Sequence, residues 1–341
     1  MNISDRHCFY KPVSWIYVER RALPYEMTKR ILSVFPEAEL ILIDHYKEIF
    51  ARPRQDVGGQ HLSGQLILAV KEGQLIYQGA PVCQDFGEDH FYYTSCQMNC
   101  VFDCEYCFLK GVYPSGYRVL FVNAQDFLEE TKKLLAEHPV YISISYDTDL
   151  LAMEKLTGYV RAWQDLASSE PDLRVEVRTK SAAANMWDAL KPLPGMIYAF
   201  TMSPQPVVDR FEHGTPSLAR RIAAAAEGLR RGFAVRLCFD PMICLTGWRA
   251  AYGQMLEEIS EGLPLDQVRD FSVGSFRVSQ DYLKRMRRLM PRSAVVQYPY
   301  ENIDGVYQYP PTLAEEMETF VENGLKALAP GKGVYRWKEQ I

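Results

Sequence analysis

Short apolar runs rich in β-branched and aromatic residues alternate along the chain with longer segments in which apolar residues recur every three or four positions. The first pattern predicts buried strands and the second predicts amphipathic helices. The predicted strands are Ile16–Glu19, Leu40–Asp44, Gln65–Val70, Arg118–Val122, Val140–Ser145, Arg174–Arg178, Ile197–Met202, Ala234–Phe239, Phe271–Gly274 and Ala294–Gln297. The predicted helices are Ala124–Glu137, Leu150–Leu166, Leu218–Arg231, Tyr252–Leu263, Gln280–Met290 and Leu313–Leu328.

This order predicts parallel βαβ units, because a helix that links two parallel strands also covers one face of their sheet. About six such units follow residue 90, which favours an α/β fold of the partial (β/α)6 barrel type, with functional side chains at the carboxyl ends of the strands. The alternation is weaker before that point. We therefore expect an N-terminal α/β extension packed on the barrel over 1–88, the barrel itself over 89–310, and a C-terminal helix and tail over 311–341.

Composition and charge narrow the classes of function. The chain has 341 residues, of which 48% are hydrophobic, and its net charge of −5 gives no overall positive field that would favour nucleic acid. Asp5, Arg6 and His7 interrupt the N-terminus too early for a signal peptide, and no apolar run of about 18 residues predicts a membrane span. We therefore expect a cytoplasmic monomer that does not associate with membranes.

The cysteines are distributed unevenly. In a reducing compartment eight cysteines do not predict disulfides. Cys100, Cys104 and Cys107 have the spacing C-x3-C-x2-C within the stretch TSCQMNCVFDCEYCFL, and Cys96 is left over, which we interpret as a neighbouring buried thiol. The remaining four are scattered, as is typical of small core residues, and are Cys8, Cys83, Cys238 and Cys244.

The clustered cysteines fit two kinds of metal site. A structural zinc ion needs four protein ligands, commonly in two C-x2-C pairs, and only Cys104 and Cys107 form such a pair. No histidine pair at ligand spacing completes it, although zinc bound by all four clustered cysteines stays an alternative. Three thiolates on a short loop instead favour a [4Fe–4S] cluster with one iron left open to bind a substrate or cofactor.

The loop also resembles a known superfamily. Its spacing, with the aromatic Tyr106 before the third cysteine and Phe108 after it, is similar to that of radical S-adenosylmethionine (SAM) enzymes. Several further stretches, taken in order, resemble the spore photoproduct lyase family and span most of residues 14–310. They are Pro24–Asp56, Cys107–Gly111 (CFLKG), Ser145–Gly158 (SYDTDLLAMEKLTG), Glu176–Lys180 (EVRTK), Phe200–Ala224 and Gly232–Ile243.

The resemblance implies a SAM site beside the cluster. Tyr106 would lie by the adenine, Thr148 and Thr201 would contact SAM, and Asp149, the acid beside Thr148, belongs to the same cofactor-binding set. Lys180 would pair with the SAM carboxylate, which suits a compact positive charge. Apart from Tyr106, these positions fall at the ends of predicted strands, so we expect them to face one common mouth.

The resemblance further implies the reaction and the partners. Reductive cleavage of SAM at the [4Fe–4S] cluster yields a 5′-deoxyadenosyl radical that abstracts hydrogen from the substrate. In the family that substrate is a thymine dimer in spore DNA, which has to be swung out of the duplex to reach a barrel mouth. The implied partners are damaged DNA and an electron donor such as flavodoxin or ferredoxin.

The chain departs from the family pattern at the step that returns hydrogen to the product. The family has a cysteine where this chain has Tyr146 and a tyrosine where it has Phe108. Three interpretations follow: Tyr146 donates its phenolic hydrogen, Cys238 donates from another strand end, or the enzyme is a radical SAM relative with a different substrate. A zinc-bearing nucleic-acid-binding module is the alternative from another functional class.

Overall fold

The computed structural model describes residues 12–79, 83–183 and 185–337. Cys8 and the N-terminal segment that argued against a signal peptide lie outside these ranges. Within them, none of the helices combines the length and apolar character that crossing a bilayer requires.

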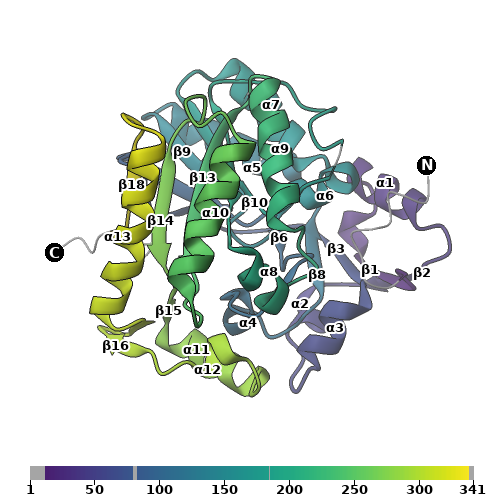
Figure 1. Cartoon of the computed structure of the whole chain (residues 1–341). Coiled ribbons are helices and arrows are strands. Elements are labelled where there is room, and N and C mark those ends of the chain that lie inside the picture. The colour runs from purple at the N-terminus through teal and green to yellow at the C-terminus, as the bar shows by residue number, and fades with distance from the viewer. Residues whose placement is uncertain (1–11, 80–82, 184, 338–341) are drawn as a thin grey trace.

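The framework of the molecule is two sheets with helices packed around them (Figure 1). The larger sheet has eight strands in the order β18-β14-β13-β11-β10-β9-β5-β4. β4 (Ile76–Gln78) is antiparallel at one edge, and β18 (Val334–Arg336) is parallel at the other. The six strands between them are parallel and in chain order, and they are β5 (Phe91–Thr94), β9 (Val140–Ser143), β10 (Leu173–Thr179), β11 (Met196–Thr201), β13 (Ala234–Met242) and β14 (Phe271–Ser275). This is the arrangement predicted for a partial (β/α)6 barrel.

Amphipathic helices cover the outer face of this sheet (Figure 1). The residues of β9, β11 and β14 are buried throughout, as expected for parallel strands that are covered on both faces. The predicted single helix Leu150–Leu166 is wrong, because Gly158 at φ +69° ends one helix and begins the next. The helices are α5 (Ala124–Leu135), α6 (Leu150–Thr157), α7 (Tyr159–Ser169), α8 (Gln205–Phe211), α9 (Leu218–Arg230), α10 (Trp248–Gly262) and α13 (Pro311–Leu328).

The second sheet has five strands in the order β2-β1-β3-β8-β6. Its strands are β2 (Glu39–Ile43), β1 (Trp15–Glu19), β3 (Leu66–Ala69), β8 (Arg118–Phe121) and β6 (Gln97–Met98), and its helices are α1 (Glu26–Val34), α2 (Lys47–Phe50) and α3 (Val57–Ser63). Neither sheet is confined to one side of residue 88 in the sequence. The five-stranded sheet includes β6 and β8, which follow that residue, and the eight-stranded sheet includes β4, which precedes it. The predicted limits at residues 88 and 310 therefore stay predictions.

A smaller unit lies beside the barrel at the foot of Figure 1. The predicted strand Ala294–Gln297 is wrong: these residues form a short helix, α12, whose first turn is capped when the Ser293 hydroxyl accepts a hydrogen bond from the Val296 N–H. Val295 and Val296 are buried in a separate apolar cluster, so the run is apolar because it is packed and not because it is extended. The other elements here are α4 (Leu109–Val112), α11 (Gln280–Leu289), β15 (Arg277–Ser279), β16 (Glu301–Ile303) and β17 (Val306–Gln308).

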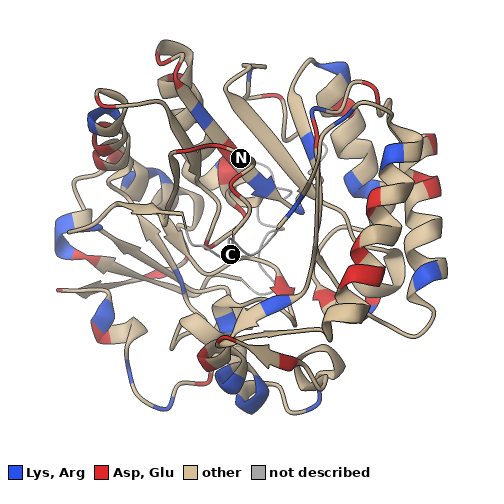
Figure 2. Ribbon diagram, turned by 90° about the vertical axis from the view of Figure 1, so that its left-hand side faces the viewer, with Lys and Arg blue, Asp and Glu red and all other residues tan. Residues whose placement is uncertain are grey.

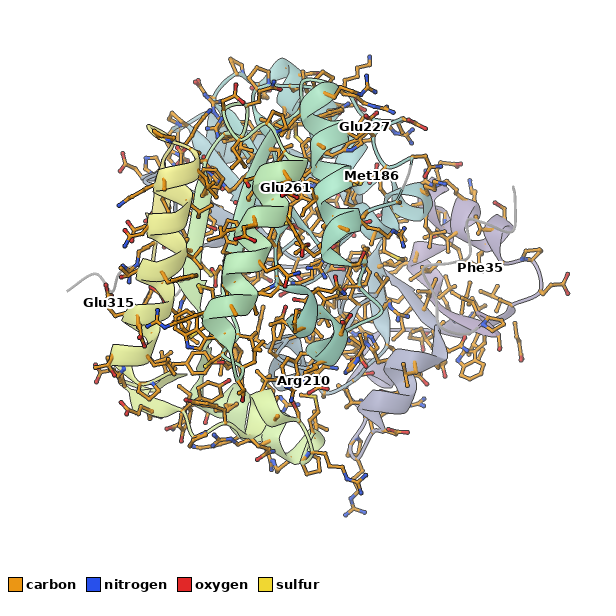
Figure 3. All side chains as sticks on the ribbon, viewed as in Figure 1. Phe35, Met186, Arg210, Glu227, Glu261 and Glu315 are labelled. Atoms are coloured by element: carbon orange, nitrogen blue, oxygen red, sulfur yellow. The ribbon has the colours of Figure 1, made fainter. Side chains whose placement is uncertain are left out.

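Charged residues of both signs are mixed along the outer helices, as the colours of Figure 2 show. Glu227, Glu261 and Glu315 lie on α9, α10 and α13, on the side of the molecule seen in Figure 3. The described residues of this outer face thus show no concentration of positive charge.

Candidate functional site

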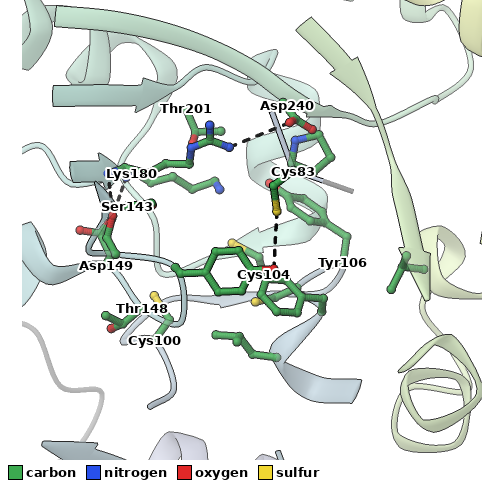
Figure 4. A pocket seen from close by; sticks show the side chains of 18 of the residues that line it. Cys83, Cys100, Cys104, Tyr106, Ser143, Thr148, Asp149, Lys180, Thr201 and Asp240 are labelled. Carbon is green, nitrogen blue, oxygen red and sulfur yellow. Dashed lines mark hydrogen bonds and ion pairs between the residues drawn. The ribbon is translucent and has the colours of Figure 1, made fainter. Parts of the chain in front are cut away.

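A cavity of about 350 Å³ opens where the barrel strands end, and its size is in the range of small-molecule sites (Figure 4). Side chains at the ends of β9, β10, β11 and β13 form one side of its wall, including Ser143, Lys180, Thr201 and Asp240. The cysteine loop and the segment around β15 form the other side. The cavity therefore lies at the carboxyl ends of the strands, where a functional mouth is expected.

Cys100, Cys104 and Cys107 all line this cavity. Their loop is held by a short antiparallel pairing between β7 (Asp103–Cys104) and β12 (Glu212–His213). The pairing places Cys104 opposite Glu212, and the Glu105 N–H donates to the carbonyl of Phe211 at 2.8 Å. Nothing in the local sequence around the cysteines indicated this anchor, because it comes from the loop after α8.

Burial favours the protonated form of all three thiols. Burial raises the pKa of Cys100 to about 12 and raises those of Cys104 and Cys107 as well. The positive charge of Lys180 opposes this effect at all three thiols. Metal binding by these cysteines must therefore release protons, and it gains from the nearby ammonium group.

The donor set fits an iron–sulfur cluster. Among the described residues, no group of three or more His, Cys, Asp or Glu side chains has the geometry to hold a single metal ion. A [4Fe–4S] cluster makes a different demand, because each cysteine binds a separate iron and the thiols therefore do not have to converge on one ion. Cys100, Cys104 and Cys107 meet that demand, and Lys180 would offset the charge of the cluster.

Lys180 extends from the end of β10 into the cavity (Figure 4). Its ammonium nitrogen lies 5.6 Å from the centre of the Tyr106 ring, and it forms no ion pair with any acid in the described part of the chain. Tyr106 is held from behind, because its hydroxyl donates to the buried carboxylate of Glu212. Glu212 also pairs with Arg221, and the positive charge of that arginine contributes to holding the pKa of the acid low, at about 2, against the effect of burial. An unpaired cation beside a fixed aromatic ring suits the carboxylate and adenine of SAM.

The remaining predicted SAM positions differ in what their side chains do. Thr148 and Thr201 both line the cavity, and the Thr148 hydroxyl accepts a hydrogen bond from the Gln97 amide at 2.6 Å. Asp149 is buried, and its carboxylate accepts from the N–H of Ala152, from the Thr179 hydroxyl and from the N–H of Lys180. Asp149 also lines the cavity, and its hydrogen bonds connect the end of β10 to the start of α6 at this wall.

The two candidate hydrogen donors lie in different places. Tyr146 lines the cavity with its ring stacked on Tyr93 at 4.2 Å and tilted against Phe108 at 5.6 Å. Cys238 is fully buried in β13, near the positive charge of Arg178. It is not among the described residues that line the cavity. The structure thus brings Tyr146 to the site and leaves Cys238 in the strand interior.

The sequence predicts that two other cysteines, Cys96 and Cys83, are buried thiols. Cys96 is buried and directs its thiol at the carbonyl of Ile144, away from the cavity lining, which agrees with its interpretation as a buried thiol. Cys83 was expected to be a core residue, and that expectation is wrong. It is half-buried on the cavity wall, and its sulfur lies 3.5 Å from the hydroxyl oxygen of Tyr146.

A charged network inside the barrel was also missed. Arg236 donates to Glu176 at 2.8 Å, to the Tyr141 hydroxyl at 2.7 Å and to Asp270 at 2.9 Å, and all four residues are buried. Glu176 also lines the cavity, so this network forms part of its wall. The sequence carried a signal, because Arg174, Glu176 and Arg178 alternate with apolar residues along β10 and share one face of it.

Known proteins resemble this chain over nearly its whole length. It is 22% identical over 287 residues to the spore photoproduct lyase of Clostridium acetobutylicum, covering 82% of each chain. It is 22% identical over 266 residues to the spore photoproduct lyase of Bacillus subtilis, covering 75% of each.

Solved structures agree on the fold. A spore photoproduct lyase double mutant with bound AdoMet and dinucleoside spore photoproduct matches with a TM-score of 0.80 at 18% identity, covering 94% of this chain and 98% of that one. A lyase complexed with dinucleoside spore photoproduct matches with a TM-score of 0.80 at 17% identity, covering 95% and 98%. These matches confirm the predicted partial barrel of the radical SAM type.

A family model described as spore photoproduct lyase matches residues 87–301, which is more than half of the chain and includes Cys100, Cys104 and Cys107. The match confirms both the predicted family and the predicted class of enzyme, a radical SAM lyase. The chain belongs to the spore photoproduct lyase family.

Proposed function

We propose that this protein repairs a thymine-dimer photoproduct in DNA by radical SAM chemistry. The observation that carries the proposal is that Cys100, Cys104 and Cys107 line the same cavity as Lys180, a cation without an acidic partner among the described residues. The three cysteines would hold a [4Fe–4S] cluster. When bound, the cluster and SAM supply a 5′-deoxyadenosyl radical that abstracts hydrogen from the substrate.

In this proposal the residues of the chain bind and orient. Lys180 pairs with the carboxylate of SAM, Tyr106 packs against the adenine, and the hydroxyl groups of Thr148 and Thr201 donate hydrogen bonds to the cofactor. Asp149 holds the backbone of Lys180 in place through the 2.7 Å hydrogen bond. The partners we propose are damaged DNA, with the lesion swung out of the duplex, and a one-electron donor such as flavodoxin or ferredoxin. We propose that the enzyme works as a cytoplasmic monomer.

A second function is favoured by one specific observation. Tyr146 and Phe108 occupy the positions where the resemblance implies a cysteine and a tyrosine, and both line the cavity. A cavity wall that departs from the family pattern at both positions suits a radical SAM enzyme of the same lineage that acts on another substrate. This alternative shares the cluster and the SAM site with the first and differs from it only in the molecule from which hydrogen is taken.

One experiment tests both functions. Protein reconstituted anaerobically with iron and sulfide is incubated with reductant, SAM and dinucleoside spore photoproduct, and thymine monomers and 5′-deoxyadenosine are measured. We expect both products from the natural protein and neither from Cys104→Ala. Cys96→Ala is the matched control, because its thiol is buried nearby but faces away from the cavity, and it should form both.

The other outcomes are equally informative. Formation of 5′-deoxyadenosine without thymine would reject lesion repair and support the second function. Purified protein that contains zinc, but neither iron nor sulfide after reconstitution, would reject both and support the zinc-bearing module. Circular dichroism of Cys104→Ala separates loss of the cluster from loss of the fold.

A further inference from the structure

Cys83 and Tyr146 form a thiol–phenol pair on the wall of the cavity. Their side chains come from different parts of the chain: Cys83 lies between β4 and β5, and Tyr146 follows β9. The sulfur of Cys83 and the hydroxyl oxygen of Tyr146 are 3.5 Å apart, which is the contact drawn as a dashed line below Cys83 in Figure 4. That distance is within the range of a hydrogen bond that involves sulfur.

We propose that Cys83 returns the hydrogen atom to the product radical and that Tyr146 is its redox partner. This inference rests on the proposed function, because a carbon radical left on the substrate must be quenched before release. Four of the described thiols line the cavity, and three of them are assigned to the cluster. Cys83 is the fourth, so it is the thiol that stays available to face a substrate.

The environment keeps Cys83 in the form that such a step needs. A thiol can give up a hydrogen atom, whereas a thiolate has none on its sulfur. Burial raises the pKa of the Cys83 thiol and outweighs the opposing effects of Tyr146 and Arg178. Burial also raises the pKa of the Tyr146 phenol, so both groups keep their hydrogens at neutral pH.

Aromatic packing fixes the partner. Tyr93 stacks on the Tyr146 ring at 4.2 Å with an interplanar angle of 29°, and Phe108 lies tilted at 5.6 Å. Phe108 has no hydroxyl group to compete for the thiol. The phenol oxygen is thus presented to Cys83 by a ring held through contacts with its two aromatic neighbours.

The proposed transfer balances in three steps. The S–H bond of Cys83 breaks homolytically and a C–H bond forms on the product radical, which leaves a thiyl radical. The O–H hydrogen of Tyr146 then passes to the sulfur, which restores the thiol and leaves a phenoxyl radical. One electron from the flavodoxin- or ferredoxin-class donor and one proton from solvent return Tyr146 to the phenol.

Solvent deuterium tests the transfer, because thiol and phenol hydrogens exchange with D₂O. Reconstituted protein is incubated in D₂O with reductant, SAM and dinucleoside spore photoproduct, and the thymine product is analysed by mass spectrometry. We expect one deuterium per repaired lesion from the natural protein. Cys83→Ala should still form 5′-deoxyadenosine but at least tenfold less deuterated thymine product, and Tyr146→Phe should support a first turnover and slow those that follow.

Cys244→Ala is the control, since this cysteine is partly buried outside the described lining of the cavity. It should match the natural protein. A Cys83→Ala protein that yields the natural amount of deuterated thymine would overturn the inference while leaving lesion repair intact. Absence of 5′-deoxyadenosine from the natural protein would overturn the proposed function, and the inference with it.

A second measurement needs no turnover. Reconstituted protein without SAM or reductant is alkylated with a maleimide in the presence and absence of dinucleoside spore photoproduct, and the modified peptides are mapped. We expect the lesion to slow labelling of Cys83 severalfold and to leave Cys244 unchanged. Equal labelling of Cys83 at lesion concentrations that saturate binding by calorimetry would show that the thiol does not face the substrate.

Discussion

Asp149 accepts a hydrogen bond from the backbone N–H of Lys180 at 2.7 Å, so the turn after β9 fixes the end of β10. The same carboxylate accepts from the Thr179 hydroxyl at 2.8 Å and caps α6 through the N–H of Ala152 at 3.0 Å. The Asp149 carboxylate thus connects the segment after β9 with the end of β10 and with the first turn of α6. The position of the Lys180 side chain in the cavity depends on this junction.

Removing the Asp149 carboxylate should destabilise the fold and the site together. Asp149→Ala leaves two N–H groups and a hydroxyl without their acceptor, so we expect the free energy of unfolding to fall by about 2–4 kcal/mol. Urea unfolding followed by circular dichroism measures the loss. Asp165→Ala, an exposed acid on α7, should change it by no more than about 0.5 kcal/mol. Similar losses in both variants would contradict the role of Asp149 as a junction.

Lys180→Met should weaken SAM binding without unfolding the protein. The variant keeps the length of the side chain and removes the charge that would pair with the SAM carboxylate. We expect the dissociation constant of SAM to rise about 10- to 100-fold in calorimetry on reconstituted protein. Lys133→Met on the outer helix α5 is the matched control, because Lys133 is exposed and pairs with Glu130 on the same helix. An unchanged dissociation constant in Lys180→Met would remove Lys180 from the proposed SAM site.

Glu154 should make stability depend on pH. Its carboxylate accepts hydrogen bonds from the N–H groups of Val160 and Arg161, and burial raises its pKa to about 7 from the ordinary 4.5. Between pH 4.5 and 7 the folded protein therefore holds a proton that the unfolded chain has released, so this residue's contribution to stability falls as the pH rises.

Glu154→Gln measures that contribution, because the amide oxygen still accepts a hydrogen bond while the group no longer titrates. The stability of the natural protein relative to Glu154→Gln should fall by about 3 kcal/mol between pH 4.5 and pH 7.5, as judged by urea unfolding at each pH. A constant difference across this range would show that Glu154 titrates normally in the folded state.

Close packing at Gly111 couples the helix after the cysteine loop to α11. A Cβ atom at Gly111 in α4 would lie 2.5 Å from the Cβ and 2.7 Å from the carbonyl oxygen of Tyr282, which lines the cavity from α11. We expect Gly111→Ala to lower the free energy of unfolding by about 1–3 kcal/mol, because one of the helices has to shift.

The control for Gly111→Ala is a glycine with room around it. At Gly253 in α10 an added Cβ would find Phe320 at 3.8 Å, an ordinary contact distance. Gly253→Ala should raise the free energy of unfolding by about 0.5–1 kcal/mol, because alanine loses less backbone entropy in a helix. Thermal unfolding of both variants checks the opposite signs, and a Gly111→Ala protein as stable as the natural one would show that α4 and α11 separate easily.

Much of the barrel could be predicted from the sequence, because its strands are buried on both faces and read as continuous apolar runs. The same logic failed at Ala294–Gln297, where a short buried helix has the same apolar composition as a buried strand. It also missed the break at Gly158, since the apolar periodicity continues from α6 into α7. Periodicity records burial along one element and does not record where the chain bends between two.

The sequence by itself determined the family of the chain and predicted the chemistry of the cysteine loop. The spacing of Cys100, Cys104 and Cys107 is local, and a local spacing limits which metal centre a loop can hold whatever surrounds it. The order of strands and helices likewise determined the barrel, because parallel strands need crossover helices.

Only the tertiary structure decided which residues from distant parts of the sequence meet at the cavity. Tyr106 meets Glu212 across 106 residues of sequence, and Cys83 meets Tyr146 across 63. Such contacts have no signature in composition or periodicity, because they arise when separate loops converge at the same edge of the sheet. Cys83 looked like a core residue for that reason, and the packing of two distant segments placed it on the cavity wall.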